Sequence, residues 1–522
     1  MMPVKVIALI SSMFVLSSLL TFAGGIRVKN AVIDEINLQK KYAYVSFDLS
    51  WENSWRSDLP GTGHVDPFNH DAAWVFVKYK DQAGYFRHAL LSSISRSHVS
   101  DGKAAISASP DGKGVFIYSG SNFSGRAEYR GIRLKWNFGS ENAEIKKSTE
   151  IRVLAVEMVY VPEGSFYAGD GASYGSLYGK TQDVPSLIGE GESLVRASRN
   201  SFDDEALIQE GFWISGKSGI RSKDGSFENP EYPCGYGAFY IMKYEISQGE
   251  YSGFLNLISV KQSYRREAKA YGEYRNTIRF DGNKFIAERP SRACNFLSWM
   301  DGAAYADWTG LRPMSELEFE KAARGFNSGA GLPNAAKKNE FAWNDDSISP
   351  ALSIGGKEDG SEVAEGNAAF GNVTYKGGDG MSGPLRCGIF ENPGQGKLSG
   401  RSYYGVLDLS GNLAEQCVTI GNQAGRSFTG NEGDGMLNEA GDADVSYWPG
   451  INGNSDQEKS SLAYVGNVVE GPGVTAAAGS GQKGGSWYTK KSFLMISDRS
   501  YASHPLDYRS ESAGFRCVRS AR

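Results

Sequence analysis

Cysteine is scarce in this chain of 522 residues, and the few that exist exclude several kinds of site. No two of them are spaced as Cys-x-x-Cys, which excludes a zinc knuckle and a thioredoxin-type redox motif. Their odd number leaves at least one thiol without a partner inside the chain. Which of them pair stays open, and we expect most to be small buried hydrophobes. The five are Cys234, Cys294, Cys387, Cys417 and Cys517.

An excess of positive charge is also missing. Lys and Arg number 55 against 60 Asp and Glu, which gives a formal net charge of -5. A surface of this kind does not attract a phosphate backbone. Nucleic acid is therefore not an expected partner.

Long apolar runs are absent beyond the N-terminus. The single run, residues 6–22, follows Lys5 and ends in Thr21-Phe22-Ala23, a small-x-small pattern that signal peptidase cuts. It is shorter than the roughly 20 residues that a membrane-spanning helix needs. We therefore predict a signal peptide over residues 1–23, with no transmembrane span after its removal. The protein is then exported to the periplasm, the outer surface or the extracellular space.

Residues 24–155 are predicted to form an all-β sandwich. Short runs that alternate apolar and polar residues, such as 42–51 and 73–79, are separated by clusters of Gly, Asp, Asn and Ser. The tryptophans of this part are expected in the core rather than on a sugar-binding platform. The spacing of His64, His70 and His88 does not match a metal site. The tryptophans are Trp51, Trp55, Trp74 and Trp136.

Three helix starts stand out in the rest of the chain. Each is a capping box, in which a Ser side chain and an acid three residues later satisfy each other's free backbone donors. Gly310 and Gly325 are expected to end the second and third helices. Residues 170–232 and 326–480 are expected to be irregular, with ordered loops in the second stretch. The boxes are Ser247/Glu250, Ser298/Asp301 and Ser315/Glu318.

Seven short motifs follow one another between residues 158 and 517. They are Met158-Val-Tyr-Val-Pro-Glu-Gly-Ser-Phe166, Phe239-Tyr-Ile-Met-Lys-Tyr-Glu-Ile-Ser247, Leu297-Ser-Trp-Met-Asp-Gly-Ala-Ala-Tyr305, Leu311-Arg-Pro-Met-Ser-Glu-Leu-Glu-Phe-Glu-Lys-Ala-Ala-Arg-Gly325, Tyr404-Gly-Val-Leu-Asp-Leu-Ser-Gly-Asn-Leu-Ala-Glu415, Gly484-Gly-Ser-Trp487 and Gly514-Phe-Arg-Cys517. In this order they resemble the formylglycine-generating enzyme (sulfatase-modifying factor) family. The resemblance implies an α+β, C-type-lectin-like domain over residues 156–522, rich in irregular loops and fused to the sandwich.

The resemblance also implies that the family's chemistry is missing. In that family two cysteines after the GGS motif bind copper(I) and activate oxygen, and soft thiolates suit copper(I). The matching positions are Thr489 and Leu494, and no cysteine lies between Cys417 and Cys517. Copper is therefore not expected. Iron is not expected either, because the histidine motif of the related sulfoxide synthases is absent. The side chains predicted to surround the former active-site groove are Trp487, Arg499 and Arg516.

Two calcium sites of the family have counterparts in this sequence. Calcium takes six to eight oxygen ligands, and loops that mix carboxylates with carbonyls provide them. One predicted site consists of Asp408, Gly411, Leu413 and Glu415. The other consists of Asn372, Val373, Asp379 and Met381.

These observations favour an exported, non-catalytic binding or scaffold protein of the cell envelope. Its partner would be an envelope protein, a peptide or a glycan. One alternative is an oxidoreductase that converts a protein cysteine to formylglycine, or another metal-dependent oxidative enzyme with atypical ligands. A second alternative is a glycan-binding adhesin that uses aromatic residues of the sandwich.

Overall fold

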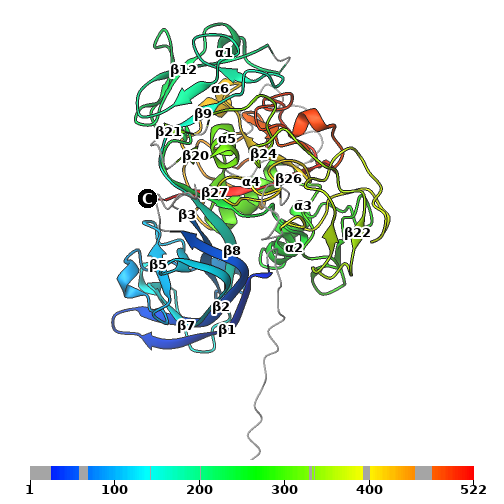
Figure 1. Cartoon of the computed structure of the whole chain (residues 1–522). Coiled ribbons are helices and arrows are strands. Elements are labelled where there is room, and N and C mark those ends of the chain that lie inside the picture. The colour runs from blue at the N-terminus through cyan, green and yellow to red at the C-terminus, as the bar shows by residue number, and fades with distance from the viewer. Residues whose placement is uncertain are drawn as a thin grey trace, which may run out of the picture.

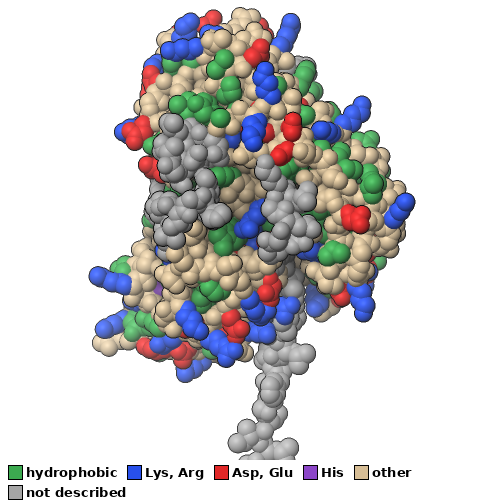
Figure 2. All heavy atoms as spheres, viewed as in Figure 1, with side chains coloured by type: hydrophobic (Ala, Val, Ile, Leu, Met, Phe, Trp, Pro, Cys, Tyr) green, Lys and Arg blue, Asp and Glu red, His purple; other side chains and the backbone are tan. Residues whose placement is uncertain are grey.

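The computed structural model describes residues 25–57, 69–141, 143–199, 202–327, 332–333, 335–391, 400–452 and 473–521. The predicted signal peptide and His64 lie outside these ranges. Among the described residues, no helix has the length and apolar character that crossing a membrane requires. Lys and Arg side chains are interspersed with Asp and Glu on the face shown in Figure 2.

Strands β1 to β8 form the N-terminal part, the lower lobe of Figure 1. β2 lies between β1 and β7, whereas β3 pairs with β4, β6 and β8, and β5 pairs with β6. The end of β2 pairs with the start of β3 and joins the two groups. The bounds are β1 Arg27–Asn37, β2 Tyr42–Ser57, β3 Asn69–Lys80, β4 Phe86–His88, β5 Ala104–Ala108, β6 Val115–Ser119, β7 Phe123–Trp136 and β8 Ile151–Val161, with short 3-10 turns at Ser95–Ser97 and Phe138–Glu141.

Burial alternates along β2, which is the pattern of a strand that packs one face on a core. From Tyr42 to Trp51 every second residue is buried, as expected for a strand with one face toward a core. Trp51, Trp74 and Trp136 are fully buried, which confirms their predicted role. Trp55 is half-buried, and the Arg401 guanidinium lies 4.4 Å from its ring centroid.

β8 is shared between the N-terminal strands and the rest of the chain. Its residues Ile151 to Val159 pair with β3, and its end, Met158 to Val161, pairs with β16. The sheet then continues through β27 to β19. The domain boundary drawn from the sequence, between residues 155 and 156, lies inside this strand.

The remainder combines six helices with short strands among the described residues. The helices are α1 Glu205–Gln209, α2 Gln248–Leu255, α3 Val260–Arg266, α4 Trp299–Thr309, α5 Glu316–Arg324 and α6 Gln423–Arg426, with a 3-10 turn at Lys491–Leu494. The strands are β9 Phe166–Ala168, β10 Leu177–Tyr178, β11 Ser186–Ile188, β12 Ser193–Ala197, β13 Phe212–Ser215, β14 Gly219–Ser222, β15 Glu228–Asn229, β16 Phe239–Met242, β17 Ile278–Phe280, β18 Phe285–Ala287, β19 Arg312–Pro313, β20 Phe326–Asn327, β21 Leu332–Pro333, β22 Ile354–Gly355, β23 Val363–Ala364, β24 Ala414–Val418, β25 Ser480–Lys483, β26 Ala513–Phe515 and β27 Cys517–Ser520.

The helix termini follow the local signals. All three predicted capping boxes are formed, at the starts of α2, α4 and α5. Gly310 follows α4 in the left-handed conformation, with φ of 72°, and Gly325 follows α5. A fourth box, Ser259 with Gln262, begins α3 and was not predicted.

The expectation of an irregular stretch at 170–232 is wrong in part. Strands β10, β12, β13, β14 and β15 form a five-stranded sheet there, at the top of Figure 1. Each strand has two to five residues, so no run is long enough to show a clear period of two.

One hydrophobic core extends from the N-terminal strands into the part of the chain that contains the helices. The Phe76 ring on β3 meets the Trp308 ring of α4 edge-on, with centroids 5.5 Å apart. The Trp74 indole N–H donates to the Thr309 carbonyl at 2.9 Å. α4 therefore packs directly on β3.

We expect Gly481→Ala to destabilise the protein by about 1–3 kcal/mol, the usual cost of overpacking a core. A Cβ on Gly481 in β25 would lie 1.7 Å from the Ala502 carbonyl oxygen, and backbone cannot move aside as a side chain can. Thermal unfolding measures the loss. Gly237→Ala is the matched control, because a Cβ there meets nothing within 4 Å. Equal melting temperatures for the two variants would contradict the prediction.

Candidate functional site

Thr489, one of the two positions that match the copper-binding cysteines, lies at a groove of about 760 Å³. Three tyrosines with about half of their surface exposed line it, Tyr488, Tyr501 and Tyr508, with exposed fractions of 52%, 41% and 53%. Phe493 stacks on Tyr501 with ring centroids 5.4 Å apart. Serine, threonine and amide groups line the rest of the wall together with charged or titratable side chains, which are Lys483, Lys490, Asp498, His504 and Glu511. Aromatic faces beside hydrogen-bonding groups are suited to binding an extended ligand.

Strand β25 positions this aromatic wall. The Gln482 N–H donates to the Tyr501 carbonyl at 2.8 Å, and Gly481 lets the Ala502 backbone approach closely. The tyrosines were missed at the sequence level, although Tyr488 directly follows the GGSW motif.

Thr489 and Leu494 do not face the same space. Thr489 lines the groove, and its Oγ1 accepts the Ser486 N–H at 2.8 Å and so closes a tight turn. Leu494 is fully buried in an apolar cluster. Its side chain lies against two glycines, since a Cβ on Gly485 would be 2.7 Å from it and one on Gly411 3.1 Å.

The three residues predicted to surround the groove do not line it, because all three are fully buried. Trp487 donates its indole N–H to the Glu511 carbonyl at 3.1 Å. Arg499 forms ion pairs with Glu316 and Asp203 at 2.9 and 2.7 Å. Arg516 pairs with Glu415 and donates to the carbonyls of Met242 and Leu407. They stabilise the fold beneath the groove.

No cysteine offers a thiolate to the groove. All five are free and buried, which confirms the expectation of small buried hydrophobes. Burial raises the pKa of each thiol, and a neutral thiol is a poor metal ligand. The residues present therefore do not fit the family's copper centre.

The first predicted calcium loop gathers buried carboxylates. The Asp408 carboxylate accepts the Gly388 N–H at 2.6 Å, and the Glu415 carboxylate pairs with Arg516 at 2.5 Å. Glu245, which the sequence did not single out, accepts the Leu413 N–H at 2.8 Å. Gly411, with φ of 100°, donates its N–H to the Gly484 carbonyl and forms the turn between these acids.

Negative charge exceeds positive charge in this loop. Burial raises the pKa of Asp408 to about 6 and that of Glu415 to about 7, despite the nearby Arg516. Burial and the Asp408 carboxylate raise the pKa of Glu245 well above its usual value. Glu415 Oε2 is buried and has no hydrogen-bond partner among the described residues. An unpaired carboxylate oxygen among acids fits a bound cation, so this loop agrees with the donor chemistry of calcium.

The second predicted calcium loop has other partners. The Asp379 carboxylate forms ion pairs with Arg275 at 3.1 Å and with Arg292 at 2.8 Å. Met381 is exposed. The backbone N–H of Asn372 donates a hydrogen bond to the Trp487 carbonyl. Two guanidinium groups supply the positive charge that a cation would bring. The side chains of this loop therefore do not fit calcium.

A further acidic group was not predicted. Within the described ranges, Asp307, Asp434 and Asp444 have carboxylate oxygens within 4.8 Å of one another. Asp307 accepts the backbone N–H groups of Asp434 and Asp444 at 2.8 and 3.2 Å. The nearby ammonium of Lys78 donates to the Gly435 carbonyl at 2.7 Å. These contacts fasten the 434–444 loop to α4.

Comparison with known protein families agrees with this architecture. Residues 191–521 match the family model described as "Sulfatase-modifying factor enzyme 1-like domain". Because the match covers more than half of the sequence, the chain belongs to this family. A comparison with curated proteins gives no match. The predicted family and the α+β fold class are thereby confirmed.

We expect calcium to raise the melting temperature more at pH 7.5 than at pH 5. The folded pKa values of Asp408 and Glu415 lie above their ordinary values, so without a cation stability falls as pH rises from about 4 to about 7. Calcium favours the ionised carboxylates and offsets that loss. Thermal unfolding with calcium or with a chelator, at both pH values, measures the effect.

Asp408→Asn should abolish the calcium shift. Asp408 has φ of 62°, and Asn tolerates this left-handed conformation, so the variant changes the ligand and not the backbone. Asp281→Asn, in an exposed turn, is the control that should keep the shift. A calcium shift that persists in Asp408→Asn would place calcium elsewhere.

Proposed function

We propose that this is an exported protein of the cell envelope that uses its sulfatase-modifying-factor-like domain for binding rather than for catalysis. The proposal rests on where the structure places Thr489 and Leu494, the positions that match the family's copper-binding cysteines. Thr489 closes a turn at the groove, Leu494 fills the core, and the cysteines are buried elsewhere. The signal peptide predicted at residues 1–23 supports export.

The groove itself supports binding. Its three exposed tyrosines present apolar faces and hydroxyls along one wall, and its loops are held by backbone hydrogen bonds. A wall that is ordered before the ligand arrives loses little entropy on binding. The partner is an envelope protein, a peptide or a glycan.

The alternative of a formylglycine-generating oxidase is tested directly. We expect a Cys-x-Pro-x-Arg peptide incubated with the protein, copper(I) and oxygen to keep its mass in mass spectrometry. A formylglycine-generating enzyme serves as the positive control. Loss of mass from the cysteine peptide would overturn the non-catalytic role.

Thr489→Cys combined with Leu494→Cys should fail to restore the copper site. The sulfur at 494 would lie in an apolar cluster, where burial disfavours the thiolate, and only the sulfur at 489 would face the groove. Copper retained after gel filtration, measured by elemental analysis, should equal that of the unmodified protein. One tightly held copper per double variant would show that both positions reach the groove.

Binding through the groove is tested by affinity capture from envelope extracts of the source organism. Tyr501→Ala should lose the captured partner, because it removes an aromatic face and its stack with Phe493. Tyr85→Ala is the matched control, because this tyrosine is 52% exposed, lies in the N-terminal part and has a ring neighbour of its own, the Arg87 guanidinium. Equal capture by both variants, or capture by neither the variants nor the unmodified protein, would count against the groove.

A further inference from the structure

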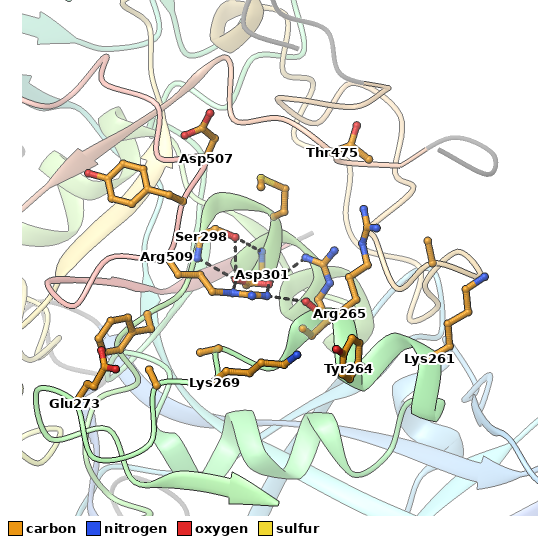
Figure 3. Close-up of a pocket in the computed structure, with 17 residues that line it drawn as sticks. Lys261, Tyr264, Arg265, Lys269, Glu273, Ser298, Asp301, Thr475, Asp507 and Arg509 are labelled. Carbon is orange, nitrogen blue, oxygen red and sulfur yellow. Dashed lines mark hydrogen bonds and ion pairs between the residues drawn. The ribbon is translucent and has the colours of Figure 1, made fainter. Parts of the chain in front are cut away.

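A second hollow of about 850 Å³ adjoins the groove, and Tyr508 lines both. Figure 3 shows it between α3, the start of α4 and the segment around Asp507 and Arg509. Basic side chains from α3 and from the loop after it line much of its wall. The start of α4, which belongs to the motif Leu297–Tyr305, contributes Ser298, Met300 and Asp301 to it, whereas the predicted calcium loops contribute nothing.

An ion-pair cluster forms the floor of this pocket. The Asp301 carboxylate lies between Arg266 at 3.1 Å and Arg509 at 2.7 Å. The Asp442 carboxylate forms ion pairs with Arg265, at 3.0 Å, and with Arg266. Three guanidinium groups thus share two carboxylates, and the cluster carries one positive charge in excess.

Two of these guanidinium groups are fixed in place and still have donors to offer. Arg509 donates hydrogen bonds from Nε and Nη2 to the Asp301 carboxylate. Arg265 donates from Nε and Nη2 to the Asp442 carboxylate. Within the part of the chain that the structure describes, neither Nη1 group has an acceptor. The Arg265 and Arg509 side chains are 22% and 31% exposed. A guanidinium that is already ordered binds an anionic group with a small loss of entropy.

The rim adds aromatic faces and further positive charge. Lys261, Tyr264 and Arg265 lie on one face of α3, because residues three and four apart are neighbours on a helix. Tyr264 is 68% exposed, and the Lys269 ammonium lies 3.7 Å from its ring centroid. Tyr508 is exposed on the shared rim. Glu273 and Asp507 also line the pocket, so an anion is expected at the arginines and away from these two acids.

We propose that this pocket binds an acidic sugar unit of a polysaccharide, with its anionic group at Arg265 and Arg509 and its ring against Tyr264. A sugar ring has an apolar C–H face that packs on an aromatic ring, while its carboxylate or sulfate ester accepts from the guanidinium groups. An acidic peptide would satisfy the arginines but would leave the exposed tyrosine faces without a flat apolar partner. The inference deepens the proposed binding role and rests on it, but it uses a different set of residues from the groove.

Titration calorimetry with the full-length protein tests the proposal with four probes. They are a galacturonate oligosaccharide, a chondroitin sulfate oligosaccharide, a neutral malto-oligosaccharide and a pentaglutamate peptide. One charge-assisted hydrogen bond contributes about 1.5–3 kcal/mol, so at least one acidic sugar should bind roughly tenfold or more tightly than the neutral sugar. The first two probes distinguish a carboxylate from a sulfate as the source of the anionic oxygens.

Two exposed variants assign the binding to this pocket. Lys269→Ala and Tyr264→Ala should each lower the affinity for the acidic sugar several-fold. Lys103→Ala and Tyr85→Ala, which change exposed side chains of the N-terminal part, should leave that affinity unchanged. Because the four side chains are exposed, the variants should fold normally, which circular dichroism checks. Arg265→Lys keeps the charge but loses the two-point contact with Asp442, and it should weaken binding as well.

Several outcomes would overturn the proposal. They are absence of binding to both acidic sugars, equal affinity for the neutral sugar, preference for pentaglutamate, and no effect of Tyr264→Ala. Binding that is lost in Tyr501→Ala but kept in Lys269→Ala and Tyr264→Ala would place the sugar in the groove. That last result would overturn the pocket while leaving the proposed binding function intact.

Discussion

The backbone ladder of β8 is the constraint on which the rest of the structure depends. One strand pairs with β3 along most of its length and with β16 at its end. Because the two pairings overlap at Met158 and Val159, the N-terminal strands and the family domain share one sheet. α4 then packs across the same junction through Trp308 and Thr309. The position of the groove relative to the N-terminal strands is therefore set by hydrogen bonds and not by a linker.

Buried ion pairs hold this junction in a single arrangement. Lys243, fully buried, lies 3.5 Å from Glu157 on β8 and 3.2 Å from Glu391. Burial alone would lower the pKa of Lys243, but the Glu391 and Glu157 carboxylates outweigh it and raise the value. A buried lysine that lost these partners would be an uncompensated charge, which is strongly destabilising. The junction therefore depends on keeping these carboxylates beside Lys243.

The sequence predicted what depends on neighbouring residues. Capping boxes and glycine stops involve atoms within one turn, so α2, α4 and α5 begin where their Ser residues indicated. Burial of a long polar side chain depends on partners far along the chain. Arg499 reaches Glu316 and Asp203, and Arg516 reaches Glu415, and no local pattern distinguishes these arginines from exposed ones. The three side chains that the sequence assigned to the groove therefore lie buried and outside its lining.

The segment from Leu506 to Ser510 explains how two different hollows can adjoin. Along this segment the lining residues alternate between the two hollows. Leu506 and Ser510 line the groove, whereas Asp507 and Arg509 line the basic pocket. Tyr508, on the ridge between them, borders both. A ligand long enough to contact both hollows must pass over this tyrosine, so the chemistry of one site constrains what can occupy the other.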